Sequence, residues 1–448
     1  MNTSTRNKPS PPVTPAAPPS RQAGAPFHVM TKPGGSRCNL DCHYCFYLEK
    51  EKLYPRGPGD TMRMSREVLE NYIRDYIAAQ PGPVVNFAWQ GGEPTLMGVK
   101  FFREAVALQK RHANGKQIKN AFQTNGTLLD DEWGHFLAGE NFLTGISIDG
   151  PRALHDAYRV DRGRRPTFDR VMAGMDVLEK HRVEYNTLAT VHHKNVKQAI
   201  DVYRFLRKNG SGYLQFIPIV ERMPETGPAP HNLTLSPPPE PAARATPADA
   251  ADAETAARVT PWSVRPTEFG AFLCAIFDEW VTRDVGHVFV QHFDTALGKW
   301  ADAPGGACVF AETCGRALAV EHNGDVYSCD HYVYPGYRLG NLRDAPLTDL
   351  VESPFQQKFG AGKRDTLPRR CRECPVKFAC NGDCPKHRFA TTPDGEPGIS
   401  YLCAGLLRFF THIDSAMTTM TALLRSQHPP AEIMRLPRNR WLPGRTDL

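Results

Sequence analysis

The chain has no uninterrupted apolar run long enough to cross a bilayer, which takes about 20 residues. Residues 1–26 contain proline and alanine but no continuous hydrophobic segment, so we find no secretion signal in them. We therefore expect a soluble, cytoplasmic protein that contacts no membrane.

Charge of one sign is not concentrated anywhere in the chain. The formal net charge of +6 is spread over stretches of mixed sign rather than gathered in one arm. Because nucleic-acid-binding proteins usually carry clustered Lys and Arg, we expect no nucleic acid as a partner.

Cysteine, in contrast, is plentiful, with 12 in 448 residues. The cytosol keeps thiols reduced, so these residues read better as metal ligands than as disulfides. Three of them, Cys38, Cys42 and Cys45, lie in one short segment. Thiolates are the usual protein ligands of iron-sulfur clusters, and three of them would hold three irons of a 4Fe-4S cube while leaving the fourth open to a small chelating molecule. Oxygen attacks such clusters, so we expect an anaerobic or low-oxygen setting.

A zinc site is the alternative for these three thiols. Zinc normally takes four protein ligands, and the next cysteine along the chain is Cys274. The CxxxCxxC spacing, with Tyr44 before the last thiol and the loop Lys32-Pro33-Gly34-Gly35 upstream, instead resembles the radical S-adenosylmethionine (SAM) enzymes. That resemblance implies that SAM chelates the open iron and that one electron cleaves its sulfonium, giving a 5′-deoxyadenosyl radical.

Strand-like and helix-like segments alternate from Phe27 onward. The predicted strands are residues 27–31, 84–90, 119–124, 144–149, 183–192 and 212–220. The predicted helices are residues 65–79, 99–113, 130–138, 167–180 and 195–208, with Ser65, Asp130, Thr167 and Asn195 as N-caps. This alternation indicates an α/β fold with a parallel sheet, and six such strands fit the partial (β/α)6 barrel of radical SAM enzymes, with chemistry at the carboxyl ends of the strands.

The domain organisation follows from changes in composition. We expect a disordered Pro-rich tail over residues 1–24, the barrel over 25–221, a Pro/Ala-rich insert or linker over 222–261, a cysteine-rich module over 262–410, and a C-terminal helix and tail over 411–448. Residues 262–283 are expected to be largely helical, with Cys274 among their apolar residues. We interpret Cys274 as a buried structural thiol.

Eight more cysteines lie in the C-terminal third, and with Cys274 and the first three they account for all 12. Taken alone, the spacing of Cys371, Cys374, Cys380 and Cys384 is also compatible with a zinc ribbon. Joined to the first motif, the set resembles the SPASM-type extension, which holds two auxiliary 4Fe-4S clusters. The resemblance implies one cluster on Cys308, Cys314, Cys329 and Cys384 and another on Cys371, Cys374, Cys380 and Cys403, which gives three clusters in total.

The whole pattern resembles the anaerobic sulfatase-maturating enzymes. Its motifs are Cys38-Asn39-Leu40-Asp41-Cys42-His43-Tyr44-Cys45-Phe46-Tyr47-Leu48-Glu49-Lys50, Gln90-Gly91-Gly92-Glu93-Pro94-Thr95-Leu96, Gln123-Thr124-Asn125-Gly126, Ser147-Ile148-Asp149-Gly150-Pro151 and Cys329-Asp330-His331. The resemblance implies an oxidoreductase that converts a Cys or Ser of an unfolded sulfatase polypeptide to Cα-formylglycine. It also implies an electron donor such as a flavodoxin or ferredoxin.

Individual roles follow from the same resemblance. Gly92 and Glu93 would meet the methionine amine of SAM, Ser147 and Arg159 would hold the methionine moiety, and Tyr44 and Val220 would line the adenine. For the glycines the alternative is a strand-ending turn, and the other residues taken singly are ordinary core or surface positions.

Asp330 is the residue that we expect to act as general base. After hydrogen abstraction from Cβ, it would take the proton of the substrate thiol or hydroxyl while an electron passes to an auxiliary cluster. The alternative is a solvated carboxylate near an Asn323-Gly324 hairpin. Tyr47 is a candidate for positioning the substrate peptide, with packing as its alternative.

Two other functions fit parts of the sequence. Another SPASM-type peptide maturase that forms a crosslink would share both cysteine sets. A zinc-binding interaction module with a degenerate barrel would bind metal without catalysis, and it would stay colourless after reconstitution with iron and sulfide.

Overall fold

The computed structural model describes residues 22–54, 61–223, 259–437 and 441. Within these ranges, the main sheet has ten strands in the order β10-β9-β8-β1-β2-β3-β4-β5-β6-β7, and β11 and β12 form a separate pair. The strands are β1 (His28–Lys32), β2 (Val84–Trp89), β3 (Gln117–Thr124), β4 (Phe142–Ser147), β5 (Tyr185–Val191), β6 (Tyr213–Pro218), β7 (Phe289–Val290), β8 (Ala317–Glu321), β9 (Asp325–Tyr327), β10 (Arg338–Asn341), β11 (Ala390–Thr391) and β12 (Pro397–Ile399).

Helices make up most of the remaining regular structure. The α-helices are α1 (Arg66–Ala79), α2 (Val99–His112), α3 (Asp131–Gly139), α4 (Arg152–His155), α5 (Phe168–Lys180), α6 (Ala199–Asn209), α8 (Pro266–Arg283), α9 (Gln291–Trp300), α10 (Leu347–Val351), α11 (Pro354–Asp365), α12 (Arg369–Arg372), α13 (Lys377–Cys380) and α14 (Cys403–Arg425). The short 3₁₀ helices that matter for the site are η1 (Leu48–Leu53), η2 (Pro94–Met97) and η5 (Asp330–Tyr332).

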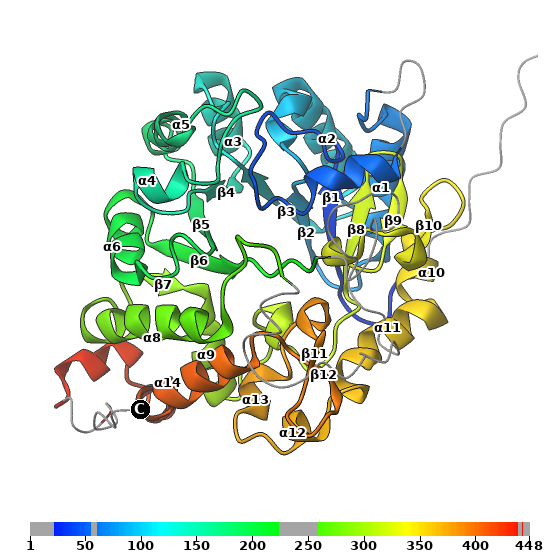
Figure 1. Cartoon of the computed structure of the whole chain (residues 1–448). Helices are drawn as coiled ribbons and strands as arrows, with labels where there is room; N and C mark the ends of the chain where they lie inside the picture. The colour runs from blue at the N-terminus through cyan, green and yellow to red at the C-terminus, as the bar shows by residue number, and fades with distance from the viewer. Residues whose placement is uncertain (1–21, 55–60, 224–258, 438–440, 442–448) are drawn as a thin grey trace, which may run out of the picture.

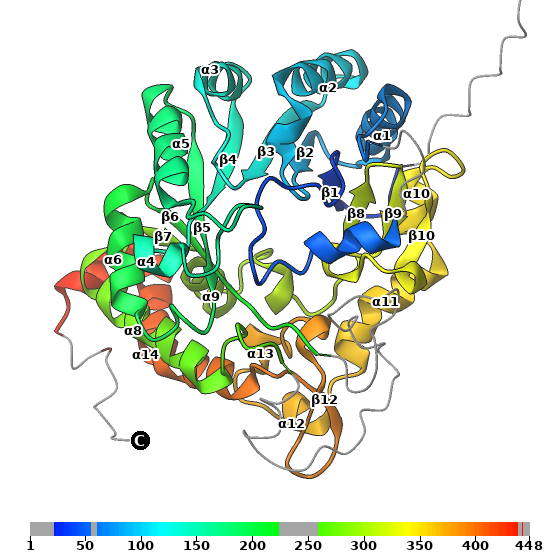
Figure 2. The same ribbon diagram turned by 45° about the horizontal axis from the view of Figure 1, so that its top comes forward.

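Strands β1 to β6 pair in parallel and in chain order. They curve into an incomplete ring whose outer side is covered by the helices that connect them (Figures 1 and 2). This is the partial (β/α)6 barrel that the sequence predicted, and its six strands are confirmed within a few residues. Two further parallel strands were not predicted, β7 beside β6 and β8 beside β1.

The strands and helices form because each has a regularly spaced apolar side. Burial alternates along β5, where Tyr185, Thr187, Ala189 and Val191 are buried and the residue between each two of them is partly exposed, as expected for a strand with one face on the core. In α1, buried Tyr72 and Tyr76 lie one turn apart. The Tyr76 ring meets Phe87 of β2 edge-on with centroids 5.0 Å apart, which holds the helix on the sheet.

The C-terminal module continues the barrel sheet rather than standing apart from it. Strand β8 pairs with β1 along its whole length, and β9 returns antiparallel to β8 after a turn at Gly324, as the predicted Asn323-Gly324 hairpin requires. Helix η5 follows β9, and β8 lies between β9 and β1 in the sheet. Pairing between β1 and β8 therefore brings Asp330 close to the residues that end β1.

Two of the four predicted N-caps are confirmed by their hydrogen bonds. The side chain of Ser65 accepts from the Val68 N–H, and that of Asp130 accepts from the Trp133 N–H. Thr167 does precede α5 but makes no capping bond, because its hydroxyl donates to the Arg159 carbonyl at 2.9 Å.

The prediction for Asn195 was wrong, since α6 begins at Ala199 after Gln198. The Asn195 side chain instead accepts from the His192 N–H at 2.8 Å and donates to the Thr190 carbonyl at 2.9 Å. The Asn195 side chain thus forms hydrogen bonds that hold this loop on the end of β5, and it does not cap a helix.

Most of the predicted tail and insert lies outside the described residues, namely 1–21 and 224–258. The helix expected over residues 262–283 is α8, which begins at Pro266 in the first turn, where proline is tolerated. Cys274 is buried in α8, 6% exposed, as predicted. Helix α14 packs along α8 and runs through position 410 without a break.

Candidate active site

The cluster loop, residues 38–45, follows β1 directly. Within it the Cys45 N–H donates to the Cys42 carbonyl at 3.0 Å. Burial raises the pKa of all three thiols, that of Cys42 to about 12, and for Cys38 and Cys42 the neighbouring thiols raise it further. Because metals bind the thiolate, three buried thiols at one place need a strong positive charge to ionise together, and an iron cluster supplies one.

An amide network holds this loop against the end of β3. Asn125 donates to the Asn39 side chain at 2.8 Å, and Asn39 donates in turn to the Thr127 hydroxyl at 2.8 Å. The Asn125 amide also lies 3.7 Å from the Cys38 sulfur. We gave these residues no role from sequence, although Asn39 and Asn125 lie in two of the family motifs.

The glycine motif after β2 packs against residues 35–37, which lead directly into the cluster loop. The Gly92 N–H donates to the Gly35 carbonyl and the Glu93 N–H to the Arg37 carbonyl, both at 2.8 Å. A Cβ atom on Gly92 would lie 2.0 Å from the Arg37 carbonyl oxygen. Only glycine allows this approach, so the motif fixes the position of the loop that carries the three thiols.

Glu93 is buried, 1% exposed, and its carboxylate is heavily bonded. It accepts from the Asn125 N–H and the Thr124 hydroxyl at 2.8 Å, and from the Thr95 hydroxyl and N–H at 2.7 and 3.0 Å. Burial raises the pKa of the Glu93 carboxyl group, and these hydrogen bonds partly offset that rise. Glu93 therefore joins the ends of β2 and β3, and contact with the methionine amine stays a prediction.

Asp149 is a residue whose importance we missed. Its carboxylate is 0% exposed and accepts from the Tyr44 hydroxyl at 2.5 Å, Arg159 Nε at 2.9 Å and the Thr190 N–H at 2.9 Å. Burial opposes its ionisation, but the Arg159 guanidinium, helped by His192, holds its pKa below the usual range. The Ser147-Ile148-Asp149-Gly150-Pro151 motif was the available signal.

Asp149 thus brings together two residues that we predicted separately. The Arg159 guanidinium lies 5.6 Å from the Tyr44 ring centroid, over its face. Ser147 ends β4 and accepts from the Gln123 amide at 3.1 Å, whereas Val220 is buried just after β6. These positions lie at or just beyond the carboxyl ends of their strands, the edge where (β/α) barrels carry their chemistry.

Asp330 stands on the C-terminal module and faces the barrel. Its Oδ1 lies 2.5 Å from Nζ of Lys32, which is buried at the end of β1. Burial opposes ionisation of Asp330, but Lys32 and then His331 hold its pKa below the usual range. Asp330 is preceded in sequence by Cys329 and followed by His331. The Nδ1 atom of His331 lies 3.5 Å from the sulfur of Cys384. The carboxylate is thus next to one auxiliary thiol set.

Tyr47 lies between the same two modules. Its ring is under Lys32, with Nζ 3.8 Å from the centroid, and its hydroxyl donates to the buried carboxylate of Glu321. The side chain is 4% exposed, so packing is its observed role in this structure. Contact of Tyr47 with a substrate peptide stays a prediction. The sequence analysis did not identify Lys32 and Glu321 as the residues that contact Tyr47.

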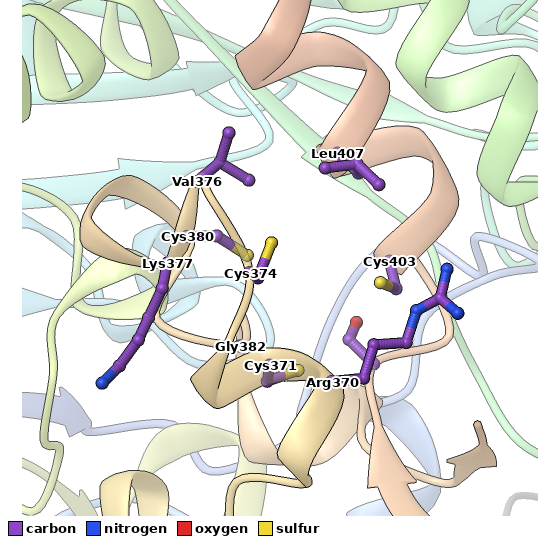
Figure 3. A pocket seen from close by; sticks show the side chains of 10 residues that line it. Arg370, Cys371, Cys374, Val376, Lys377, Cys380, Gly382, Cys403 and Leu407 are labelled. Atoms are coloured by element: carbon purple, nitrogen blue, oxygen red, sulfur yellow. The ribbon is translucent and has the colours of Figure 1, made fainter. Parts of the chain in front are cut away.

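The eight C-terminal thiols fall into two groups. In the first, the charges of Cys314, Cys329 and Cys384 interact with that of Cys308, and Cys329 also interacts with Cys384. The second group, Cys371, Cys374, Cys380 and Cys403, lines a single pocket between α12, α13 and the start of α14 (Figure 3). The second set that the resemblance implied therefore lines one pocket and the charges of the first set interact, whereas the assignment of a cluster to each set stays a prediction.

The spacing within these groups is wide. Among the residues that the structure describes, no three His, Cys, Asp or Glu side chains lie close enough to hold one metal ion. A cubane places each thiolate on a separate iron, so it matches a wider spacing than a single-ion site does.

In the part of the chain that is described, no helix is long and apolar enough to cross a membrane.

Comparison with protein families agrees with the barrel and with the cysteine module. The radical SAM superfamily matches residues 33–206, and an iron-sulfur cluster-binding domain, SPASM, matches residues 308–375. Fold and site thus define a radical SAM enzyme with a SPASM extension, a class that uses SAM and 4Fe-4S clusters.

Similar proteins narrow this class. The chain is 44% identical over 410 residues to the serine-type anaerobic sulfatase-maturating enzyme of Bacteroides thetaiotaomicron, covering 92% of this chain and 95% of the relative. It is 30% identical to the cysteine-type enzyme of Clostridium perfringens, covering 86% and 96%. The chain belongs to the anaerobic sulfatase-maturating enzymes. It superposes on the solved structure of anSMEcpe with bound AdoMet and Cp18Cys peptide with a TM-score of 0.73 at 29% identity, covering 89% of this chain and 99% of that one.

Proposed function

We propose that this chain oxidises a serine of an unfolded sulfatase polypeptide to Cα-formylglycine. It would accept cysteine at the same position, where water would hydrolyse the resulting thioaldehyde to formylglycine with release of hydrogen sulfide. Support for serine comes from the relatives, since the chain is 44% identical to a serine-type enzyme and 30% identical to a cysteine-type enzyme. Support for a polypeptide substrate comes from the similar structure that holds a peptide.

We assign the cofactors to the thiol sets as follows. The N-terminal cluster is held by Cys38, Cys42 and Cys45, and the two auxiliary clusters are held by the two groups of four described above. When bound, SAM and the N-terminal cluster would supply a 5′-deoxyadenosyl radical able to take a hydrogen atom from Cβ of the substrate. The auxiliary clusters would supply an acceptor for one electron.

SAM itself is held by residues at the strand ends. The assignment gives Gly92 and Glu93 the methionine amine, Ser147 and Arg159 the methionine moiety, and Tyr44 and Val220 the adenine. Asp149 positions Tyr44 and Arg159 together by accepting a hydrogen bond from each of them.

Asp330 takes the proton of the substrate hydroxyl or thiol. Loss of a hydrogen atom from Cβ makes that proton far more acidic, so a carboxylate held ionised by Lys32 suffices as base. The ion pair between Asp330 and Lys32, placed beside the thiol set that contains Cys329, is the observation that carries this assignment. Tyr47, beside the same lysine, positions the peptide.

A small redox protein such as a flavodoxin or ferredoxin would supply electrons to the cluster that Cys38, Cys42 and Cys45 would hold. The enzyme needs one electron to cleave SAM and releases one when the substrate radical is oxidised.

The test is anaerobic incubation with SAM, a reductant and two sulfatase-motif peptides that differ only in Ser or Cys. We expect an aldehyde, trapped with a hydrazide probe, and one deoxyadenosine per aldehyde, with the serine peptide converted at least as well as the cysteine peptide. A product that loses two hydrogens but does not react with hydrazide would instead support the crosslinking alternative.

A further inference from the structure

Lys50 is a buried lysine without a hydrogen-bonding partner. It lies in η1, just after the cluster loop, and its side chain is 1% exposed. Its Nζ atom makes no hydrogen bond with any residue that the structure describes and lies 3.0 Å from the centroid of the Tyr334 ring. A buried amine without an acceptor is costly, so its retention calls for a reason.

The nearby carboxylates do not supply that acceptor. The charges that act on Lys50 include those of Glu221, Asp330 and Glu321. Each is engaged by another side chain. Glu221 pairs with Lys386, Asp330 pairs with Lys32 at 2.5 Å, and Glu321 accepts from the Tyr47 hydroxyl.

The amine therefore makes no hydrogen bond to any of these three carboxylates, although Oε2 of Glu321 is itself without a hydrogen-bonding partner among the described residues. Burial and then the positive charge of Lys386 lower the pKa of Lys50 well below its usual value. The N–H groups donate in either protonation state, so its capacity to bind an acceptor does not depend on the charge.

Lys50 also lies near the residues that we place beside the substrate. The backbone N–H of Lys50 donates to the Tyr47 carbonyl at 3.0 Å. The Tyr47 ring lies under Lys32, the partner of Asp330. The charge of Asp330 also acts on the Lys50 amine. The unsatisfied donor thus lies close enough to the proposed base for the two charges to interact.

We propose that Lys50 binds the substrate polypeptide by donating to one of its backbone carbonyl oxygens. An extended chain offers a carbonyl at every residue, so a fixed donor can select a register without requiring a particular side chain. The inference rests on the proposed function for the class of substrate and adds a binding residue to it.

The first test is Lys50→Met, which keeps the length and apolar volume of the side chain and removes the donor. Lys52→Met is the matched control, because Lys52 is in the same short helix but its side chain is 43% exposed. With a fluorescent sulfatase peptide and the cluster-loaded protein, we expect the Kd and KM of Lys50→Met to rise about tenfold, as for a lost hydrogen bond that leaves its buried acceptor unpaired, with kcat nearly unchanged. Lys52→Met should match the wild type.

A second measurement separates substrate binding from a role in folding. If Lys50 only supports the fold, Lys50→Met lowers the Tm of the peptide-free enzyme and leaves the peptide Kd unchanged, which would overturn the proposal. If Lys50 awaits a substrate carbonyl, Lys50→Met leaves the peptide-free Tm unchanged or higher, because a buried donor without an acceptor has been removed. The wild type should then gain more Tm from the peptide than the variant does.

The acceptor is identified by replacing single amides of the peptide with esters, which accept hydrogen bonds more weakly. We expect one ester to weaken binding to the wild type but not to Lys50→Met. Loss of binding only when an acidic side chain of the peptide is neutralised would overturn the backbone assignment. Since binding is measured without turnover, an enzyme that binds the peptide through Lys50 but forms no aldehyde would contradict the proposed function and not this inference.

Discussion

Nζ of Lys32, the last residue of β1, lies 2.5 Å from Oδ1 of Asp330, which opens η5 in the C-terminal module. The two residues are brought together by the parallel pairing of β1 with β8. The ion pair therefore joins the barrel that would hold SAM to the module that would hold the auxiliary clusters, at the point where we place the substrate.

Asp330→Asn should separate SAM cleavage from product formation. The amide cannot take the substrate proton, so deoxyadenosine should still form while the aldehyde yield falls about a hundredfold or more. Asp365→Asn, at an exposed carboxylate, is the control and should behave as the wild type. Full aldehyde yield from Asp330→Asn would remove Asp330 from the role of base. Lys32→Met should show the same uncoupling, with partial recovery in Lys32→Arg.

Asp149→Asn should weaken both SAM binding and the fold. The substitution leaves the buried guanidinium of Arg159 without its counter-charge, which costs about 3–5 kcal/mol of unfolding free energy. Chemical denaturation and SAM titration measure the two effects. The exposed pair of Asp169 and Arg152 provides the control, since Asp169→Asn should change neither quantity. Unchanged SAM affinity in Asp149→Asn would show that the network does not organise the cosubstrate site.

Gly92→Ala should displace the cluster loop. The added methyl would meet the Arg37 carbonyl oxygen at 2.0 Å, whereas at Gly82 a methyl would meet nothing within 4 Å. Overpacking of this kind costs about 1–3 kcal/mol, and we expect SAM cleavage to fall with it. Gly82→Ala should keep both stability and deoxyadenosine formation, and equal behaviour of the two variants would refute the close approach.

Cys403→Ala should lose one auxiliary cluster. The iron content of the anaerobically reconstituted protein should fall by about four atoms per chain, because Cys403 lines the same pocket as Cys371 and Cys374. Cys274→Ala is the matched control and should keep all of its iron, since Cys274 is buried in α8. Equal iron content in the two variants would contradict the assignment of the second set.

His292 should make the protein less stable in weak acid. Burial lowers its pKa from 6.5 to about 4, so between these values the unfolded chain binds a proton that the folded protein does not. The stabilisation is complete above pH 6.5 and is lost as pH falls toward 4, by about 3 kcal/mol in total. Unfolding of His292→Phe between pH 4.5 and 7 should depend less on pH, and substitution of the exposed His287 should leave the wild-type slope. An unchanged slope in His292→Phe would assign the acid sensitivity to other groups.

The sequence alone determined those features that depend on neighbours along the chain. The alternation of apolar residues predicted the six barrel strands, and the caps at Ser65 and Asp130 are confirmed because each bond spans only three residues. The CxxxCxxC spacing and the family motifs placed the cluster loop and the class of enzyme. The capping bond at Thr167 and the cap at Asn195 were wrong, because these side chains bind backbone carbonyls outside their predicted helices, at Arg159 and Thr190.

Only the tertiary structure decided which distant groups meet. Nothing local marks Lys32 as the partner of Asp330, Asp149 as the acceptor shared by Tyr44 and Arg159, or Lys50 as a donor without an acceptor. Such pairings depend on strand order and on burial, which removes water and makes each unmatched charge or donor costly. The cysteine motifs in the sequence were therefore enough to indicate the cofactors, whereas the fold determines how the protein's own charged groups are arranged where we place the substrate.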